Sequence, residues 1–171
     1  MISRSKNLIP TLYITGDIDS EAFTRFSRKI KRYEREGKKK LNLELISEGG
    51  DAYSALAFYD LIKRTPIEIT AVATGLVASA ATLIFIACSK RYMTKNSYLM
   101  VHEDSLSGIE DGKVSQIEKE AKHARRLENQ WDALFYESTA ISETYWCKLN
   151  KEETFLSAEE CRKLCIIEGI L

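Results

Sequence analysis

The sequence predicts an α/β protein in which parallel strands alternate with helices around a single core. Segments of strand character alternate along the chain with segments whose apolar residues recur at helical spacing. One strand segment, residues 67–74, is apolar enough to be buried on both faces, as parallel strands between helix layers are. A chain of 171 residues can bury one sizeable core but not comfortably two, so we expect a single domain over residues 1–171.

The first predicted strand is TLYIT, residues 11–15, which Gly16 ends. Asp19 or Ser20 can then cap a helix that Gly37 closes. The apolar residues of this helix recur at helical spacing: Phe23, Phe26, Ile30 and Tyr33. The helix also carries a basic run, but glutamates interrupt the run and no aromatic stacking platform accompanies it. We interpret the run as a solvated helix face rather than a nucleic-acid site.

A second strand and helix surround a pair of glycines. Residues 41–47, LNLELIS, alternate in the manner of a strand and lead into Gly49 and Gly50. Residues 52–64 then form a predicted helix, which Pro66 ends. Paired glycines at the end of a strand allow a turn whose amides face outward, or the close approach of an extended peptide.

The next segment is an uncharged stretch, residues 69–89, that is long enough on length alone to cross a bilayer. A membrane helix would have to be continuously helical and lipid-facing. Here residues 67–74 favour a strand, which we expect Gly75 to end, and a buried helix is predicted over residues 79–88. The stretch therefore divides into a strand and a helix, and we predict no membrane span.

Charge and the first residues bear on partners and location. The chain has 25 basic and 25 acidic side chains, so no uniform field draws it to nucleic acid or anionic lipid. The opening segment MISRSKNLIP meets charge and proline before an apolar run could form the core of a signal peptide. We expect a cytoplasmic protein.

A long helix is predicted from about residue 113 to residue 138. Its apolar stripe is sparse and small in the middle, so it would bury little against its own core. A second copy of the chain is the natural cover for it. Two short helices follow, over residues 142–150 and 158–165.

The four cysteines, Cys88, Cys147, Cys161 and Cys165, form no C-x-x-C motif, and no histidines are paired at metal spacing. We interpret all four as buried thiols and expect no metal site.

Three features could carry chemistry. Ser79 is expected on the first turn of a buried helix, where free backbone N–H groups could stabilise an oxyanion. His102 ends a predicted strand, residues 97–102, at the carboxyl edge of the sheet, where parallel sheets place their sites. The turn at Gly49 and Gly50 closes another strand. Each feature alone is more often structural: a small packing residue, a hydrogen-bonded histidine, a tight turn.

Together these features resemble the ClpP family, the proteolytic subunits of the Clp proteases. The resemblance covers nearly the whole chain from about residue 11. It is carried by four segments in order: ISEGGDAYSALAFYDLI (46–62), GLVASAATLI (75–84), NSYLMVHED (96–104) and TFLSAEECRKLCIIEGIL (154–171). It implies the spiral of parallel strands and helices of the ClpP and crotonase superfamily, with residues 113–138 as a protruding handle helix by which rings stack. It therefore also implies a homo-oligomer that encloses a chamber.

The resemblance also implies roles for particular residues. Ser79 would be the nucleophile and His102 the general base, without a cofactor. The family's catalytic aspartate falls at Glu153. The backbone amides of Gly50 and Ala80 would form the oxyanion hole. The residues from Gly49 to Asp51 would hold a peptide or unfolded protein as an added strand.

The chain departs from the family's pattern at several positions. Glu153 keeps the charge of the aspartate but adds a methylene, and a misoriented imidazole can cost ~10⁴ in rate. Glu152 is an alternative candidate for the acid. Glu48 replaces a usual proline, and Glu103 and Asp104 follow His102 where Gln-Pro is more usual. The chain begins almost at its first strand, so we expect the family's axial N-terminal loop to be largely absent, which leaves docking of an unfoldase ATPase open.

Other functions stay open at this point. The chain could be a weak or inactive ring subunit that partners an active paralogue, or a phage capsid-maturation protease. A crotonase-type acyl-CoA enzyme shares the fold but would not need Ser79 and His102 at these positions. A signal-peptide peptidase would need a membrane anchor and a lysine base, and the sequence offers a candidate for neither.

Overall fold

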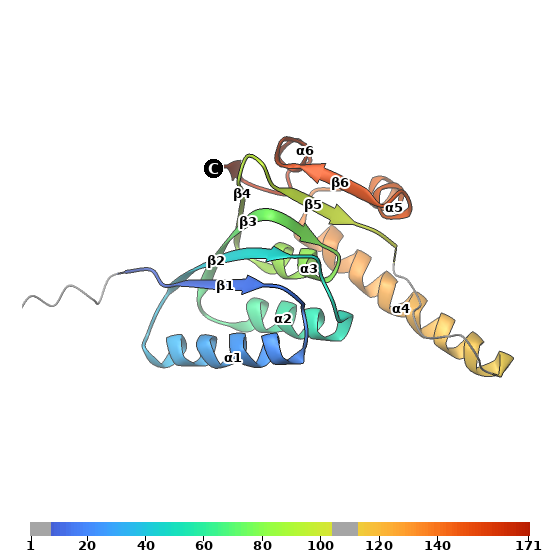
Figure 1. The fold of residues 1–171 in the computed structure, drawn as a ribbon, viewed down its shortest axis with the longest axis horizontal. Coiled ribbons are helices and arrows are strands. Elements are labelled where there is room, and N and C mark those ends of the chain that lie inside the picture. Colours follow the sequence, from blue (N-terminus) through green and yellow to red (C-terminus); the bar gives the residue numbers. More distant parts are fainter. Residues whose placement is uncertain (1–7, 104–112) are drawn as a thin grey trace, which may run out of the picture.

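The computed structural model describes residues 8–103 and 113–171, and these form one layered α/β unit (Figure 1). The strands are β1 (Thr11–Thr15), β2 (Lys40–Ser47), β3 (Glu68–Ala78), β4 (Lys90–Met93), β5 (Tyr98–Val101), β6 (Thr154–Ser157) and β7 (Gly169–Ile170). The helices are α1 (Ser20–Arg35), α2 (Ala52–Arg64), α3 (Ala80–Ala87), α4 (Val114–Ser138), α5 (Glu143–Lys151) and α6 (Ala158–Lys163).

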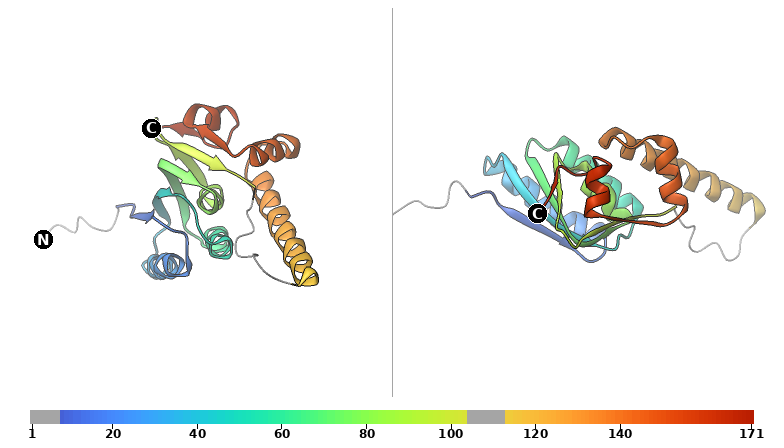
Figure 2. Two further views of the ribbon diagram at one scale, coloured as in Figure 1. Left: turned by 45° about the vertical axis from the view of Figure 1, so that its right-hand side comes forward. Right: turned by 90° about the horizontal axis from the view of Figure 1, so that it is seen from above.

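The strands form a single seven-stranded sheet. Its main path runs β1-β2-β3-β4-β7, and β5 pairs with both β3 and β6. All these pairs are parallel except β5 with β6, which is antiparallel. Helices α1, α2 and α3 line up along one side of the sheet (Figures 1 and 2). The α/β class with a parallel sheet is thereby confirmed.

The prediction that Gly75 ends the third strand was wrong. Strand β3 continues through Gly75, whose φ is +66°, to Ala78. Before Gly75 the strand pairs with β4, and after it with β5. The register between β2 and β3 also shifts between Leu45 and Ser47. The backbone conformation of Gly75 thus lets the strand pair with β4 before this residue and with β5 after it. A residue with a side chain would adopt this φ only at an energetic cost.

The uncharged stretch is accounted for by the sheet and its helix cover. Strand β3 lies in the middle of the sheet, and every residue of α3 is buried. Within residues 8–103 and 113–171, no helix combines the length and the apolar character needed to cross a membrane.

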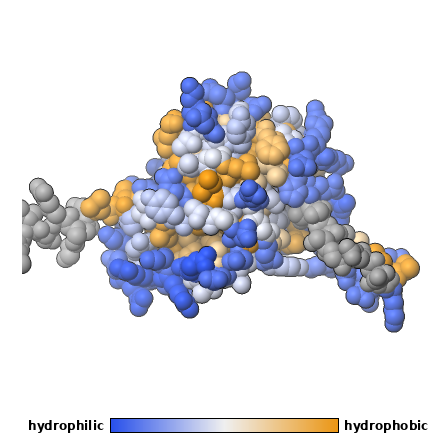
Figure 3. Space-filling view, viewed as in Figure 1, coloured by the Kyte–Doolittle hydropathy of each residue, from blue (hydrophilic) through white to orange (hydrophobic). Residues whose placement is uncertain are grey.

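Helix α1 has the solvated basic face that its sequence predicts. The Asp19 side chain accepts a hydrogen bond from the backbone N–H of Ala22 and so caps the helix. The residues that α1 buries are Ala22, Phe26 and Ile30, whereas its lysines and arginines are exposed. In Figure 3 the corresponding lower part of the surface is almost entirely hydrophilic.

Helix α4 runs out beyond the sheet (Figures 1 and 2). Its residues from Val114 to His123 are all exposed, and Phe135 near its other end is its one fully buried residue. Val114 is 72% exposed and Ile117 is 38% exposed. Among the described residues of the chain, Tyr53 of α2 contacts this half of the helix: its ring stacks on His123, and its hydroxyl lies 2.5 Å from His123 Nε2. Val114 and Ile117 stay exposed beyond that contact.

The expectation that all four cysteines are buried was wrong for two of them. Cys88 and Cys161 are buried, but Cys147 is half-buried and Cys165 is exposed. Helix α6 ends at Lys163, two residues earlier than predicted, and Cys165 follows it with φ +56°. The end of the helix therefore turns Cys165 off the face that carries Cys161.

We expect a water-soluble maleimide at pH 8 to label Cys165 first. Burial raises the pKa of the Cys88 and Cys161 thiols to about 12 each, so only about one in 10⁴ of them is a thiolate at that pH. Intact mass should show one rapid adduct, and four in denaturant. Rapid labelling of Cys88 in the folded protein would contradict this placement.

Candidate active site

Ser79 lies at the bend between β3 and α3. Its backbone has φ 50° and ψ −125°, which is unusual for a residue with a side chain and costs roughly 1–3 kcal/mol. Ser79 therefore precedes α3 as its N-cap residue, without a side-chain capping bond, rather than lying on the first turn as predicted. A serine in such a strained strand-to-helix turn has its hydroxyl free for another partner.

That partner is His102. Strand β5 runs parallel to the second half of β3, with Ala78 paired to Met100, so the segments after the two strands leave the sheet together. The backbone N–H of Ser79 donates to the carbonyl oxygen of Met100 at 2.9 Å. The Oγ of Ser79 lies 2.9 Å from Nε2 of His102. The structure thus brings together the predicted nucleophile and the predicted base.

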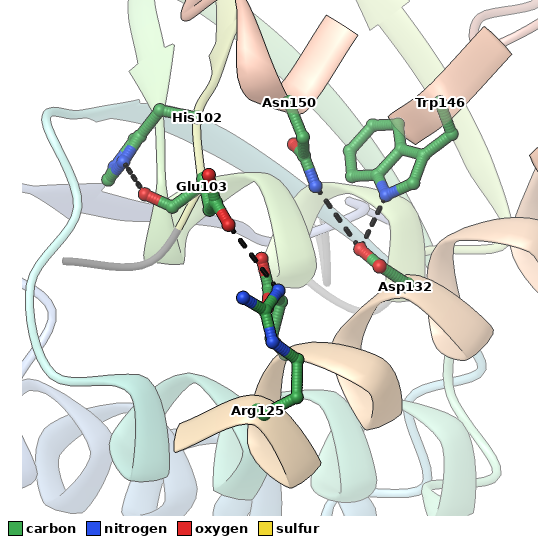
Figure 4. A network of polar contacts seen from close by, with 7 residues as sticks. His102, Glu103, Arg125, Asp132, Trp146 and Asn150 are labelled. Carbon is green, nitrogen blue, oxygen red and sulfur yellow. Dashed lines mark hydrogen bonds and ion pairs between the residues drawn. The ribbon is translucent and has the colours of Figure 1, made fainter. Parts of the chain in front are cut away.

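The other nitrogen of His102 contacts a main-chain oxygen. Its Nδ1 lies 2.7 Å from the carbonyl oxygen of Glu103 (Figure 4). A carbonyl oxygen can only accept, so this contact places the proton on Nδ1 and leaves the lone pair of Nε2 for the Ser79 hydroxyl. This is the tautomer that a general base needs.

The structure does not bring the Glu153 side chain to His102. In the antiparallel β5–β6 pair, Val101 lies opposite Thr154. The residue that follows Val101, His102, therefore comes close to the residue before Thr154, which is Glu153. Glu153 has φ +47°, and its side chain is exposed. Its backbone N–H donates to the carbonyl oxygen of Asn150 at 3.3 Å. Across the described residues, no hydrogen bond or ion pair joins the Glu153 carboxylate to His102.

The Gly49 and Gly50 turn packs directly against Ser79. The φ values of the two glycines are +110° and +146°. A Cβ on Gly49 would lie 2.8 Å from Ser79 Cβ and 3.0 Å from the backbone nitrogen of Ala80. A β-bridge joins Gly50 to Ile18. The backbone N–H of Ile18 donates to the Gly49 carbonyl oxygen at 2.8 Å. Gly49 therefore packs against the turn that carries Ser79 and Ala80, and Asp51 caps α2 just beyond the glycine pair. The oxyanion role of the Gly50 and Ala80 amides stays a prediction.

Behind His102 lies a polar network that sequence reasoning missed (Figure 4). Asp132 on α4 accepts hydrogen bonds from the indole of Trp146 at 2.6 Å and from the Asn150 amide at 3.1 Å. Burial raises the pKa of Asp132, and the Trp146 hydrogen bond opposes that shift. The sequence signal for this network was an acidic residue, Asp132, next to Trp131 in the predicted helix. The pattern could not identify its hydrogen-bond partners on α5.

A second set of charges holds the segment after His102. The guanidinium of Arg125 lies 3.4 Å from the Glu103 carboxylate and also pairs with Glu128. The backbone N–H of Glu103 donates to the carbonyl oxygen of Asn150 at 3.0 Å. Asp104, the other acidic residue that departs from the family pattern, lies outside the described residues, as do residues 1–7 at the N-terminus.

A small cavity of about 30 Å³ opens beside Ser79 and His102. Its other lining residues are Thr82, Val101, Glu128, Trp131, Asp132, Trp146 and Asn150. Within the described part of the chain, no three His, Cys, Asp or Glu side chains gather in a way that could hold a metal ion. The arrangement is a serine, a histidine in the tautomer of a base, and free helix N–H groups, which together suit attack on a carbonyl carbon.

Comparison with known proteins agrees with this geometry. The family model described as Clp protease matches residues 9–171. The ATP-dependent Clp protease proteolytic subunit 2 of Treponema denticola is 30% identical over 93% of this chain and 80% of its own. The corresponding subunit 1 of Protochlamydia amoebophila is 26% identical over 94% and 79%. A solved structure of a mutant ClpP1 from Listeria monocytogenes superposes with a TM-score of 0.86, at 26% identity, over 94% of this chain and 90% of that one.

Proposed function

Because the chain belongs to the Clp protease family, we propose that it is a cytoplasmic serine endopeptidase that cleaves peptides and unfolded proteins. The observation that carries the proposal is the 2.9 Å contact between Ser79 Oγ and His102 Nε2, at a strained turn between a strand and a helix. Ser79 is the nucleophile and His102 is the general base.

The proposed reaction has two steps. His102 Nε2 takes the hydroxyl proton while Ser79 Oγ bonds to the substrate carbonyl carbon, and the carbonyl oxygen becomes an oxyanion near the N–H groups of Gly50 and Ala80. The protonated His102 then gives its proton to the leaving amine as the C–N bond breaks. Water, activated by the same histidine, attacks the acyl group and releases Ser79.

The substrate is held as an extended strand. The turn from Gly49 to Asp51 lies next to Ser79, and its bridge to Ile18 occupies the Gly49 carbonyl oxygen and the Asp51 N–H. The main-chain groups of Gly50 are the ones we propose for strand addition. Binding through the main chain gives little dependence on substrate sequence. A peptide or an unfolded segment fits this mode, whereas a folded protein does not present a free strand.

We propose that copies of the chain assemble into stacked rings around a chamber. Support comes from α4, whose first half from Val114 to His123 is exposed and has apolar residues for another copy to cover. An unfoldase ATPase could feed the chamber only if the assembled rings present a surface on which it docks. Analytical ultracentrifugation at several protein concentrations tests the assembly.

The function is tested by incubating the purified oligomer with fluorogenic peptides and with an unfolded protein such as reduced casein. Hydrolysis of both supports the peptidase. The second candidate is a weak or inactive ring subunit, which the outward-turned Glu153 favours. Folded oligomer that hydrolyses neither substrate, alone or with an unfoldase, would replace the first proposal by the second.

The Glu153→Gln variant is expected to keep peptide hydrolysis within about threefold of wild type. Its carboxylate is exposed and away from His102, whose Nδ1 contacts the Glu103 carbonyl oxygen instead. Steady-state kcat and KM on one fluorogenic peptide measure the effect, and Glu152→Gln is the matched control. A fall towards the ~10⁴-fold loss seen when an imidazole loses its orienting acid would show that Glu153 turns inward in the working enzyme.

A further inference from the structure

We infer that Asp132 is a positioning residue for His102, acting through Asn150 and the main chain of Glu103. The inference rests on the proposed function, because it concerns how that site keeps its general base oriented. It concerns a residue of α4, and so it links the long helix to the chemistry at Ser79.

A chain of contacts from Asp132 to Ser79 carries the inference, and Figure 4 shows two of its links, Asp132 with Asn150 and Glu103 with His102. Asp132 Oδ1 accepts from the side-chain amide of Asn150 at 3.1 Å. The carbonyl oxygen of Asn150 accepts from the backbone N–H of Glu103 at 3.0 Å. The carbonyl oxygen of Glu103 lies 2.7 Å from His102 Nδ1, and His102 Nε2 lies 2.9 Å from Ser79 Oγ. Every member therefore touches the next within hydrogen-bond distance.

This series of contacts matters because the group that accepts from His102 Nδ1, the Glu103 carbonyl oxygen, is part of the backbone. A carboxylate attracts an imidazole N–H by charge, but a carbonyl oxygen must be held in place to do the same work. Among the described residues, Glu103 contacts α5 through the Asn150 carbonyl oxygen and α4 through Arg125, and these contacts help to hold it. Asn150 lies near the end of α5, where the last carbonyl groups take partners beyond the regular helix, and its carbonyl oxygen accepts from the backbone N–H groups of Glu103 and Glu153.

Asp132 is well placed to fix Asn150. Its hydrogen bonds from Trp146 and Asn150 both come from α5 and are charge-assisted when the carboxylate is ionised. The ring of Trp146 stacks on Phe135 of α4, with ring centroids 3.6 Å apart. Asp132 thus joins the end of α5, and through it the Glu103 carbonyl group, to the buried end of α4.

Arg125, which also lies on α4, contacts the same segment. It pairs with the Glu103 carboxylate at 3.4 Å, but its side chain is 63% exposed and that of Glu103 is 45% exposed. A solvent-exposed pair of this kind contributes little. We therefore assign the main positioning role to Asp132 and a minor one to Arg125.

The test compares Asp132→Ala, Asp132→Asn and Trp146→Phe. The alanine variant loses the acceptor for Asn150, and its kcat should fall at least about tenfold with KM within twofold. The asparagine variant keeps an acceptor oxygen and should recover part of the loss. Trp146→Phe removes only the indole donor, keeps the aromatic stack and leaves the Asn150 contact, so its kcat should stay within about threefold.

A second readout does not depend on activity. The chain has only two histidines, so protein labelled with ¹⁵N at histidine gives a simple spectrum, which His123→Gln assigns. Wild-type His102 should appear as a neutral ring protonated at Nδ1 at alkaline pH, and Asp132→Ala should shift it towards a mixture of both tautomers. A merely structural role of Asp132 would lower the thermal unfolding temperature without this shift.

The outcomes separate the inference from the proposed function. Unchanged kcat and tautomer in folded Asp132→Ala would overturn the inference while leaving the peptidase intact. An equal loss in Trp146→Phe would overturn it too, because helix packing would then explain the effect. A wild-type protein without peptidase activity whose His102 tautomer still responds to Asp132 would overturn the function and support the positioning role.

Discussion

Replacing Ser79 by alanine is expected to lower peptide hydrolysis by about 10⁴- to 10⁶-fold without unfolding the protein. The hydroxyl is the group that bonds to the substrate, and no other serine oxygen lies within hydrogen-bond distance of His102 across the described residues. The folded state loses one hydrogen bond between half-buried partners, which costs about 1 kcal/mol. Thermal unfolding of the variant should therefore stay close to that of wild type.

The measurement is intact mass after incubation with a fluorophosphonate probe at neutral and mildly alkaline pH. Attack by the Ser79 oxygen at phosphorus expels fluoride, so wild type should gain one stoichiometric adduct and the Ser79→Ala variant none. Ser97→Ala is a matched control, because Ser97 is buried and its hydroxyl donates to the Thr94 carbonyl oxygen away from the site. An adduct that persists in Ser79→Ala would identify a different nucleophile.

The roles of Ser79 and His102 were expected from the family resemblance, and sheet topology explains why the two residues meet. Topology alone did not predict the pairing, because the part of β3 that pairs with β5 lies beyond Gly75, where the strand was expected to end. Segments that follow parallel strands meet at one edge of the sheet, and β3 and β5 are neighbours. Helix α2 was predicted at its observed bounds, Ala52–Arg64, with Pro66 as its stop, and the structure adds Asp51 as its N-cap residue. Local chemistry was sufficient for the helix, whereas the expected meeting of Ser79 and His102 depended on the family resemblance.

Features that depend on distant partners could not be predicted in this way. Strands β4, β6 and β7 have two to four residues each, too short for a period to be recognised. Gly75 looked like the end of a strand, since only the positions of β4 and β5 show that the strand continues and changes partners there. The side chain of Glu153 depends on a backbone with φ +47°, which the sequence motif does not specify.

Asp132 shows the same limit at the candidate site. Helical periodicity places Asp132 on the same face of α4 as the buried Phe135, but its hydrogen-bond donors come from α5, fourteen and eighteen residues away. A carboxylate among apolar positions indicates a buried partner without naming it. Only the packing of α5 on α4 turns that indication into a path to His102.

The Gly49→Ala variant is expected to lose at least about 10²-fold in kcat/KM, the scale for removing an oxyanion donor. Its new Cβ would lie 2.8 Å from Ser79 Cβ and 3.0 Å from both the Ala78 carbonyl oxygen and the Ala80 nitrogen. These neighbours are backbone atoms or a Cβ, so a rotamer change cannot relieve the contact. The strand-to-helix turn must therefore move, and the Ser79 oxygen and the Ala80 N–H move with it.

Gly37→Ala separates this contact from the general cost of a side chain in an unusual backbone conformation. Gly37 has φ +69°, and a Cβ there would meet nothing within 4 Å. The control should lose about 1 kcal/mol of unfolding free energy but keep full activity per folded molecule, whereas folded Gly49→Ala should be impaired in both peptide hydrolysis and probe labelling. Equal activity in the two variants would show that the glycine turn does not set the position of the nucleophile. A selective loss in Gly49→Ala would instead show that Gly49 is needed because the turn that holds the substrate and the turn that carries Ser79 are in direct contact.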